Sequence, residues 1–458
     1  MYCLRIGMTA VVITSALYSS WGNEEPPTKK QAADADVLAT ALEGVPDLDN
    51  TSRYLQRVIE LRRRQQTVGK SGQSGASDFL AQVLATEETA LGRHYDAIRL
   101  MDNVSSTPSG PKSDTGLVGY APKDAAKTII ELAARHQVVM INEAHHVARH
   151  RAFVTLLLAG LYEKGFRYFA AEAFLDDDMP DLTKRGYPSL ETGGYCTDPV
   201  FGDLIRQALR LGYKPIAYEH YDDKPQAFQR GDEEIRREIA EREEGEARNL
   251  KQRIFDKDPK ARVVVLAGYS HVRKVSEVTK RDGKKSEITW MAARFKKLTG
   301  INPLTIDQTT VMEHVRTGCE HPAYRLAVEE KKVTDQSVVL FGAKSGQYYV
   351  PPAYSGAFDL VVFHPRDLKR DTRPRWLRMG GYRREVKVAE LPPPPKDGSL
   401  LAQAFAKGEK VELAIPVDQV EYGPAEWELM FLLPTGEYTL RVVGATGLMV
   451  HERNLKVE

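Results

Sequence analysis

Apolar residues follow two different periodicities in the central part of the chain. Residues 138–141 form a short, β-branched run with the length of a buried strand, and residues 147–164 carry apolar side chains at helical spacing until Gly165 ends the pattern. Residues 166–171 form a second apolar run of strand length. The pattern therefore predicts a strand, a helix and a second, parallel strand, which is the repeating unit of α/β proteins.

Acidic and histidine residues follow both of these strands. Glu143, His145 and His146 come directly after the first strand, and Glu172 follows the second. Because the carboxyl ends of parallel strands open onto one crevice, we expect these side chains to lie close together. The alternative is that the histidines cap helices or fill polar gaps, which is the usual role of a single histidine.

Further elements are expected later in the chain. Residues 262–267 form another buried-strand run that ends in Gly-Tyr-Ser-His, so His271 leaves a strand at the same edge of the sheet. Residues 213–218 and 337–341 predict additional strands, and residues 232–255 predict a long, highly charged helix. Three strand ends with histidines or glutamates favour a functional crevice over isolated structural histidines.

Together these segments resemble the erythromycin-esterase-like, ChaN-like and Tiki superfamily of α/β proteins. The matching segments are residues 142–146 (Gly-Glu-x-x-His or Gly-Glu-x-His in the family), 149–151 (a basic pair), 165–172 (Gly-Phe-Arg…Glu), 242–249 (Arg-Asp/Glu-x-x-Met-Ala-x-Asn), 267–272 (Ala-x-x-x-His-Val) and 357–363 (the closing strand). Their order and spacing agree over residues 121–365. Three positions depart from the family pattern: Asn142 replaces Gly, Glu246 replaces Met, and Ser270 precedes the last histidine.

The resemblance implies a hydrolase that cleaves an ester or amide in a small-molecule or peptide ligand. A histidine backed by a carboxylate can take a proton from water, and an arginine can stabilise the resulting oxyanion. We expect His271 to be the base, Glu143 and Glu172 to orient it or the water, and Arg151 or Arg242 to stabilise the oxyanion. The expected catalytic residues are Glu143, His146, Glu172 and His271, and the expected binding residues are His145, Arg151, Arg242 and Asn249.

Two alternatives remain for the same crevice. Glu143, His146, Glu172 and His271 would also suit a divalent metal ion such as Zn or Mn, with a bound water as nucleophile. ChaN-like members of the superfamily bind haem, which needs an axial His or Tyr and an apolar slot, and Tyr269 beside His271 would supply the ligand. A haem or small-ligand binding protein without catalysis is thus the second hypothesis, and a fold used only for partner binding is the third.

Length and charge bound the remaining possibilities. The chain has 458 residues and is 42% hydrophobic, so it can bury a large core and is too long for one compact domain. Its 64 Lys and Arg balance 63 Asp and Glu, and no global field attracts nucleic acid or an anionic membrane. We expect a signal peptide at residues 1–22, a leader and helical region at 23–104, the α/β domain at 114–370, a Pro-rich linker at 371–396 and a small antiparallel β-sandwich at 397–458.

The first residues predict export. Arg5 precedes an apolar run at residues 8–17, and the small residues Ser20 and Gly22 have the spacing of a signal-peptidase site. We therefore expect a periplasmic or secreted protein without an integral membrane segment after cleavage; an uncleaved N-terminal anchor is the alternative. In an oxidising compartment Cys196 and Cys319 could pair, and the sequence leaves this open.

Overall fold

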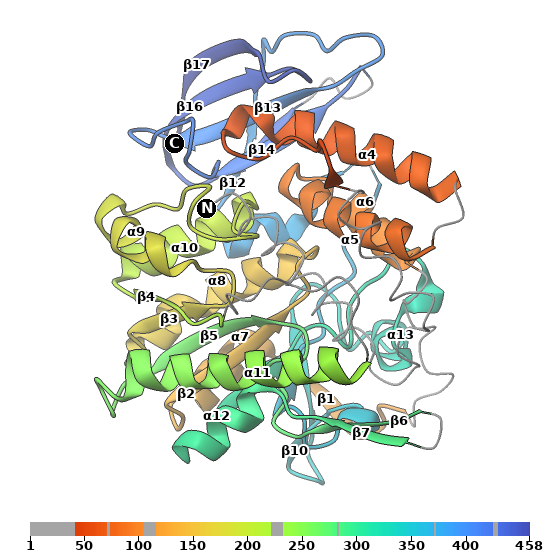
Figure 1. Ribbon diagram of the computed structural model, residues 1–458, viewed down its shortest axis with the longest axis vertical. Coiled ribbons are helices and arrows are strands. Elements are labelled where there is room, and N and C mark those ends of the chain that lie inside the picture. Colours follow the sequence, from red (N-terminus) through yellow and green to blue (C-terminus); the bar gives the residue numbers. More distant parts are fainter. Residues whose placement is uncertain are drawn as a thin grey trace.

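The computed structural model describes residues 42–70, 74–104, 116–220, 232–281, 284–370, 372–424 and 429–458. The expected signal peptide and the residues from 105 to 115 lie outside this part of the chain. The described residues form a mixed α/β structure with helices on both faces of a parallel sheet and a group of antiparallel strands at one end (Figure 1). The predicted α/β class is therefore confirmed.

The central sheet has six parallel strands in the order β11-β8-β2-β5-β3-β4. These strands are β2 (Val138–Glu143), β3 (Tyr168–Ala171), β4 (Lys214–Ala217), β5 (Val263–Gly268), β8 (Leu304–Asp307) and β11 (Leu360–Val361). Strand β5 lies between β2 and β3. The three strand ends that carry the sequence motifs are therefore neighbours at one edge of the sheet.

Helices cover both faces of this sheet because its strands are apolar on both sides. Val139 and Ile141 of β2 belong to a core with α7, α8 and α10, whereas Val138 and Met140 belong to a second core with α11 and α12. The helices are α7 (Ala125–Ala133), α8 (Ala148–Glu163), α10 (Pro199–Leu211), α11 (Asp232–Leu250) and α12 (Met291–Thr299). A π-helical turn, Lys251–Phe255, extends α11, so the charged helix expected from the sequence is present.

Shorter elements surround this domain. The strand expected at residues 337–341 is present as β9, but it belongs to a three-stranded antiparallel sheet with β1 and β10 rather than to the parallel sheet. The antiparallel strands are β1 (Tyr120–Asp124), β9 (Val338–Gly342), β10 (Gln347–Tyr348) and the hairpin β6 (Glu277–Arg281) and β7 (Lys284–Ile288). The remaining helices are α9 (Met179–Arg185) and α13 (Pro322–Glu329), with short 3-10 turns at Asp176–Asp178, Thr317–Cys319 and Pro352–Tyr354.

The N-terminal helices pack against the C-terminal strands (Figure 1). Tyr54 and Val58 share one buried core with Leu401, Ile415 and Val443. The N-terminal elements are the 3-10 turn Thr51–Arg53 and the helices α4 (Tyr54–Lys70), α5 (Ser74–Ala90) and α6 (His94–Asp102). A tertiary core thus joins two regions that are far apart in the sequence.

Two antiparallel sheets make up the C-terminal region. A four-stranded sheet, in the order β14-β13-β16-β17, shares an apolar core with the β12-β15 pair. The strands are β12 (Arg384–Lys387), β13 (Leu400–Ala406), β14 (Asp418–Tyr422), β15 (Met430–Leu433), β16 (Gly436–Val443) and β17 (Met449–Val457). Strand β12 and the 3-10 turn Arg375–Gly381 lie within the segment expected as a Pro-rich linker.

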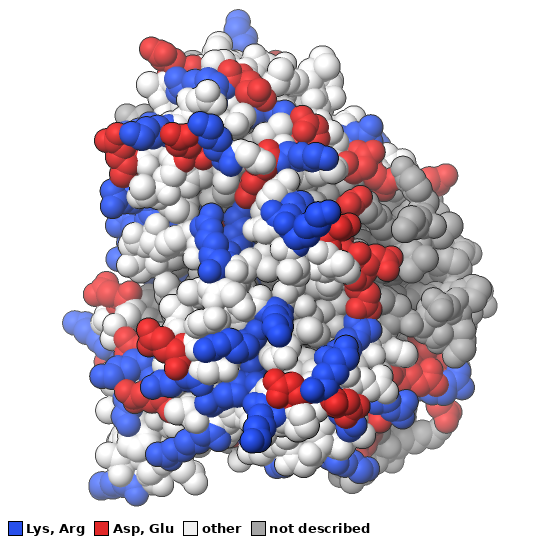
Figure 2. Space-filling view, turned by 90° about the vertical axis from the view of Figure 1, so that its left-hand side faces the viewer, with Lys and Arg blue, Asp and Glu red and all other residues white. Residues whose placement is uncertain are grey.

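Hydrophobic helix length and surface charge bear on whether the protein contacts a membrane or nucleic acid. In the described ranges, no helix combines the length and the apolar character that crossing a bilayer requires. Basic and acidic side chains lie intermixed over the face that Figure 2 shows, in keeping with the balanced composition.

Candidate active site at the carboxyl edge of the sheet

Four neighbouring strands end in one buried polar cluster. Glu143 is the last residue of β2, Gly268 is the last residue of β5, and Glu172 directly follows β3. Glu219 lies two residues beyond β4. All three glutamates are at most 3% exposed, so each needs a partner that offsets the loss of hydration.

Arg151 of α8 is the partner of Glu143. Its Nε lies 2.5 Å from Glu143 Oε2, and its Nη1 donates to Asp198 Oδ2 at 2.9 Å. Burial lowers the pKa of Arg151, but the two carboxylates outweigh burial and raise it above its ordinary value. Burial alone would raise the pKa of Glu143. Arg151 and His145 outweigh burial and hold the pKa of Glu143 below its usual range. Glu143 is therefore ionised at neutral pH.

His145 lies between this pair and the rest of the cluster. Its Nδ1 lies 3.2 Å from Glu143 Oε1, and its ring packs against Tyr195, with the ring centroids 4.3 Å apart. A Cβ on Gly268 would lie 2.9 Å from His145 Nε2 and 3.0 Å from Glu172 Oε2. His145 Nε2 and the Glu172 carboxylate thus both lie beside Gly268, where a larger residue would meet them.

Arg242 of α11 occupies the far side of Glu172. Its Nη2 donates to Glu172 Oε1 at 2.7 Å, and its Nε donates to Glu219 Oε1 at 2.8 Å. The pKa of Glu219 is raised to about 7. Burial is the main cause, the nearby carboxylates of Glu246 and Glu172 raise the pKa further, and Arg242 opposes the shift. The guanidinium group therefore connects the ends of β3 and β4 to α11.

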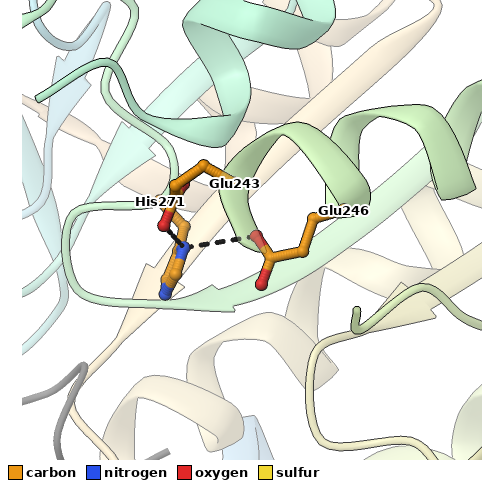
Figure 3. A group of neighbouring side chains, drawn as sticks. All are labelled: Glu243, Glu246 and His271. Atoms are coloured by element: carbon orange, nitrogen blue, oxygen red, sulfur yellow. Dashed lines mark ion pairs between the residues drawn. The ribbon is translucent and has the colours of Figure 1, made fainter. Parts of the chain in front are cut away.

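His271 is enclosed by charged side chains. Its Nδ1 lies 2.8 Å from Glu243 Oε1 and 3.3 Å from Glu246 Oε2 (Figure 3), while its Nε2 lies 3.3 Å from Arg242 Nη1. Burial lowers the pKa of His271, but Glu243, Glu246 and Glu172 outweigh it and raise the pKa well above its ordinary value. Both ring nitrogens already face charged partners, so this geometry does not favour the expected role of His271 as general base.

Two of the expected site residues lie elsewhere. His146 Nδ1 is 3.3 Å from the Tyr269 hydroxyl, and the ring lines a separate cavity of about 20 Å³ with His94 and Trp376. Burial lowers the pKa of His146 to about 3, so the imidazole is neutral. Asn249 donates to the backbone carbonyls of Tyr218 and Glu219, where it holds the chain that follows β4.

The structure therefore groups the expected residues differently from the sequence hypothesis. Glu143, Glu172 and His271 lie at the same edge together with His145, whereas His146 points away from them. The cluster also contains four acidic residues that were not expected as site residues: Asp198, Glu219, Glu243 and Glu246. The spacing of Arg242, Glu243 and Glu246 over one helical turn was the available signal, but a charged helix usually presents such residues to solvent.

The structure also shows the surroundings of Asn142 and of the two cysteines discussed above. Asn142, found where the resembled family has Gly, donates to the Tyr269 carbonyl at 2.7 Å and to Asp307 Oδ1 at 2.6 Å, so it ties β2 to β5 and β8. Cys196 and Cys319 are both free thiols, and Cys196 is buried.

Comparisons with known proteins give little further information. No family model matches the sequence, and no curated protein matches it. Matching solved structures include the type III effector HopBA1, with 13% identity over 45% of this chain and 96% of that chain and a TM-score of 0.28. RRSP, a MARTX toxin effector domain from Vibrio vulnificus, matches with 11% identity over 68% of this chain and 72% of its own, at a TM-score of 0.30.

The C-terminal region of Pasteurella multocida toxin, described as having a thiol-protease-like catalytic triad, is also similar. It shows 9% identity over 84% of this chain and 55% of that chain, with a TM-score of 0.30. Similarities this low carry no argument about function, so the proposals below rest on the residues of this chain.

Proposed function

We propose that the protein is a hydrolase that cleaves an ester or amide bond with a water activated by His145. The observation that carries this proposal is the His145–Glu143 pair. His145 Nε2 and Glu172 Oε2 lie 2.9 and 3.0 Å from the position that a Cβ on Gly268 would occupy, and Arg242 donates to Glu172. This arrangement supplies a base, a carboxylate and a cation within one buried edge of the sheet, which is what attack of water on a carbonyl requires.

Each group has a distinct role in the proposed reaction. Glu143 accepts a hydrogen bond from Nδ1–H of His145, which leaves Nε2 as the basic nitrogen. Nε2 takes a proton from water as the water attacks the carbonyl carbon, and later returns that proton to the leaving group. Glu172 orients the water, and Arg242 stabilises the negative charge that develops on the carbonyl oxygen. Arg151 keeps Glu143 ionised and in place.

The finer identity of the hydrolase is proposed from the sequence resemblance alone. It suggests an enzyme of the erythromycin-esterase/Tiki type that is exported to the periplasm or the medium and acts on a small molecule or peptide. Haem or small-ligand binding is the alternative. The charged groups on both sides of His271 disfavour it as an axial haem ligand, since haem needs an apolar slot.

A hydrolysis assay with matched variants tests the proposal. Purified protein is incubated with a panel of aryl esters, lactones and peptide anilides, and its visible spectrum is recorded for haem. His145→Gln and Glu143→Gln should each lower kcat by about a hundredfold or more, as expected for loss of a general base or its partner. His136→Gln is the control, because His136 lies before β2, at the opposite end of the strand, and contacts the Asn302 carbonyl.

Two results would contradict the proposal. One is a wild-type protein that hydrolyses no member of the panel. The other is hydrolysis that His145→Gln leaves at the wild-type rate, since the base would then lie elsewhere. A Soret band in the purified protein together with absent hydrolysis would support haem binding instead.

A further inference from the structure

The cluster around Arg242 and His271 holds an excess of buried negative charge. Four acidic side chains surround these two residues, and each is at most 3% exposed. They are Glu172, Glu219, Glu243 and Glu246. In the described part of the chain the cations in contact with them are Arg242 and, when protonated, His271. Glu219 is partly protonated at neutral pH because its pKa is raised to about 7, but Glu172, Glu243 and Glu246 alone outnumber the two cations. Burying carboxylates without equal positive charge is costly, so the cluster favours an additional cation.

The unsatisfied atoms of the cluster point to the place of that cation. Among the residues that the structure describes, neither carboxylate oxygen of Glu246 has a hydrogen-bond partner, although the side chain is fully buried. His271 Nδ1 also lacks a hydrogen bond and faces both Glu243 and Glu246 (Figure 3). The approach of Arg242 Nε to Glu246 Oε1, at 3.3 Å, is an ion pair without hydrogen-bond geometry. Buried polar atoms are normally satisfied, so these three atoms require an explanation.

Two of the separations between these atoms are close to those of a tetrahedral coordination sphere. One nitrogen of His271 and one oxygen from each of Glu243 and Glu246 lie within 4.8 Å of one another. The nitrogen is 2.8 Å from the Glu243 oxygen and 3.3 Å from the Glu246 oxygen. Tetrahedral zinc with bonds of about 2.0–2.1 Å has ligand atoms roughly 3.3 Å apart, so small shifts of these side chains would admit the ion.

We propose that Glu243, Glu246 and His271 bind a divalent transition-metal ion, for which Zn²⁺ is the test ion. Two carboxylates and one imidazole suit zinc, whereas calcium and magnesium prefer oxygen ligands alone. Glu172 Oε1 lies 3.7 Å from the Nε2 of the same imidazole, and Arg242 Nη1 lies 3.3 Å from that nitrogen. A shift of these side chains would bring Glu172 within the hydrogen-bond distance that orients metal-bound histidines in many proteins. The site does not depend on the hydrolytic reaction and differs from the metal set expected from the sequence, which contained neither Glu243 nor Glu246.

Zinc binding to the full chain tests this site directly. Protein freed of metal with EDTA is titrated with Zn²⁺ by calorimetry, and Co²⁺ is added separately to record its visible absorption. We expect one Zn²⁺ per chain, a rise in Tm on binding, and a Co²⁺ spectrum typical of four-coordination. Glu246→Gln should weaken Zn²⁺ binding by at least about tenfold, because it removes one ligand charge.

Matched variants separate this site from general acidity and from misfolding. Glu244→Gln removes a neighbouring charge on α11 that pairs with Arg294, so it should bind Zn²⁺ like wild type. Glu246→Met, an uncharged replacement suited to a buried position, serves if Glu246→Gln fails to fold. Absence of Zn²⁺ binding by the folded wild type would overturn the proposal and leave a proton on His271 as the cation. Equal affinity of wild type and a folded Glu246 variant would overturn it as well.

Discussion

Arg62 and Glu421 form an ion pair at 2.7 Å, although 359 residues separate them in the sequence. Arg62 lies on α4 and Glu421 on β14, and Arg93 also donates to Glu421, at 2.6 Å. Glu421 is buried, so its partners are needed to offset the loss of its hydration. The ion pair and the apolar core beneath it join the N-terminal helices to the C-terminal sheet.

Truncation after residue 391 should therefore destabilise the whole protein. The Pro-rich spacer, taken alone, predicts a C-terminal module that can be removed without effect. In the structure, however, Leu401, Ile415 and Val443 pack against Tyr54 and Val58. Truncation would remove these three residues and expose Tyr54 and Val58 to solvent. We expect a broad unfolding transition or a loss of soluble protein, measured by circular dichroism during heating. A shortened chain with the Tm of the full protein would contradict this expectation.

The same ion pair should make stability depend on acid. Burial raises the pKa of Glu421, but Arg62 and Arg93 outweigh it and lower the pKa to about 2. The pKa of Glu421 is lower in the folded protein than its ordinary value of 4.5 in the unfolded chain. The ion pair therefore stabilises the fold at pH values above 4.5, and this stabilisation is lost as the pH falls towards 2. The difference in unfolding free energy between wild type and Glu421→Gln should thus shrink from pH 6 to pH 2, as measured by urea denaturation. Burial raises the pKa of Glu88 and the Glu421 charge adds to that rise, so Glu88 acts in the opposite direction and is relieved in part by Glu421→Gln.

Local sequence patterns predicted the central elements because burial on both faces leaves long apolar runs. Strands β2, β3 and β5 and helix α8 lie where these runs and Gly165 place them. The convergence of Glu143, Glu172 and His271 followed from parallel strand direction alone. These features depend on short stretches of chain and on one topological rule.

Other features depend on contacts that no local pattern encodes. His145 and His146 are adjacent, and the backbone between β2 and α8 decides which ring faces Glu172. Glu246 is buried because α11 packs on the sheet edge, whereas its sequence is that of a solvated helix. The pairing of α4 with β14 likewise requires the folded chain.

Removal of Arg151 should cost far more stability than removal of an exposed arginine. Arg151 is fully buried and pairs with both Glu143 and Asp198, so Arg151→Ala leaves two buried carboxylates without their arginine partner. Breaking one side of a buried ion pair costs about 3–5 kcal/mol. Arg63→Ala is the control, because that side chain is mostly exposed and pairs with Glu60 at the surface, where such pairs contribute about 0–1 kcal/mol. The free energy of unfolding is measured by urea denaturation. Equal losses of this free energy in Arg151→Ala and Arg63→Ala would show that Glu143 and Asp198 find other partners.

Gly268→Ala should impair the proposed reaction more than it impairs folding. The added methyl group would lie 2.7 Å from His145 Cε1 and 3.0 Å from Glu172 Oε2, so at least one of these side chains must move. Overpacking of this kind costs about 1–3 kcal/mol of stability, whereas a displacement of about 1 Å in an active site can lower turnover by roughly a hundredfold.

Gly194→Ala is the matched control, because a Cβ there meets no atom within 4 Å. If Gly268→Ala acts through His145, it should add little to the loss already caused by His145→Gln, since both changes disable the same group. The measurement is kcat and Tm for the wild type, the two single variants and the double variant on one ester or amide substrate. Wild-type kcat in Gly268→Ala, or fully additive losses in the double variant, would show that the His145–Glu172 edge is not where the water is activated.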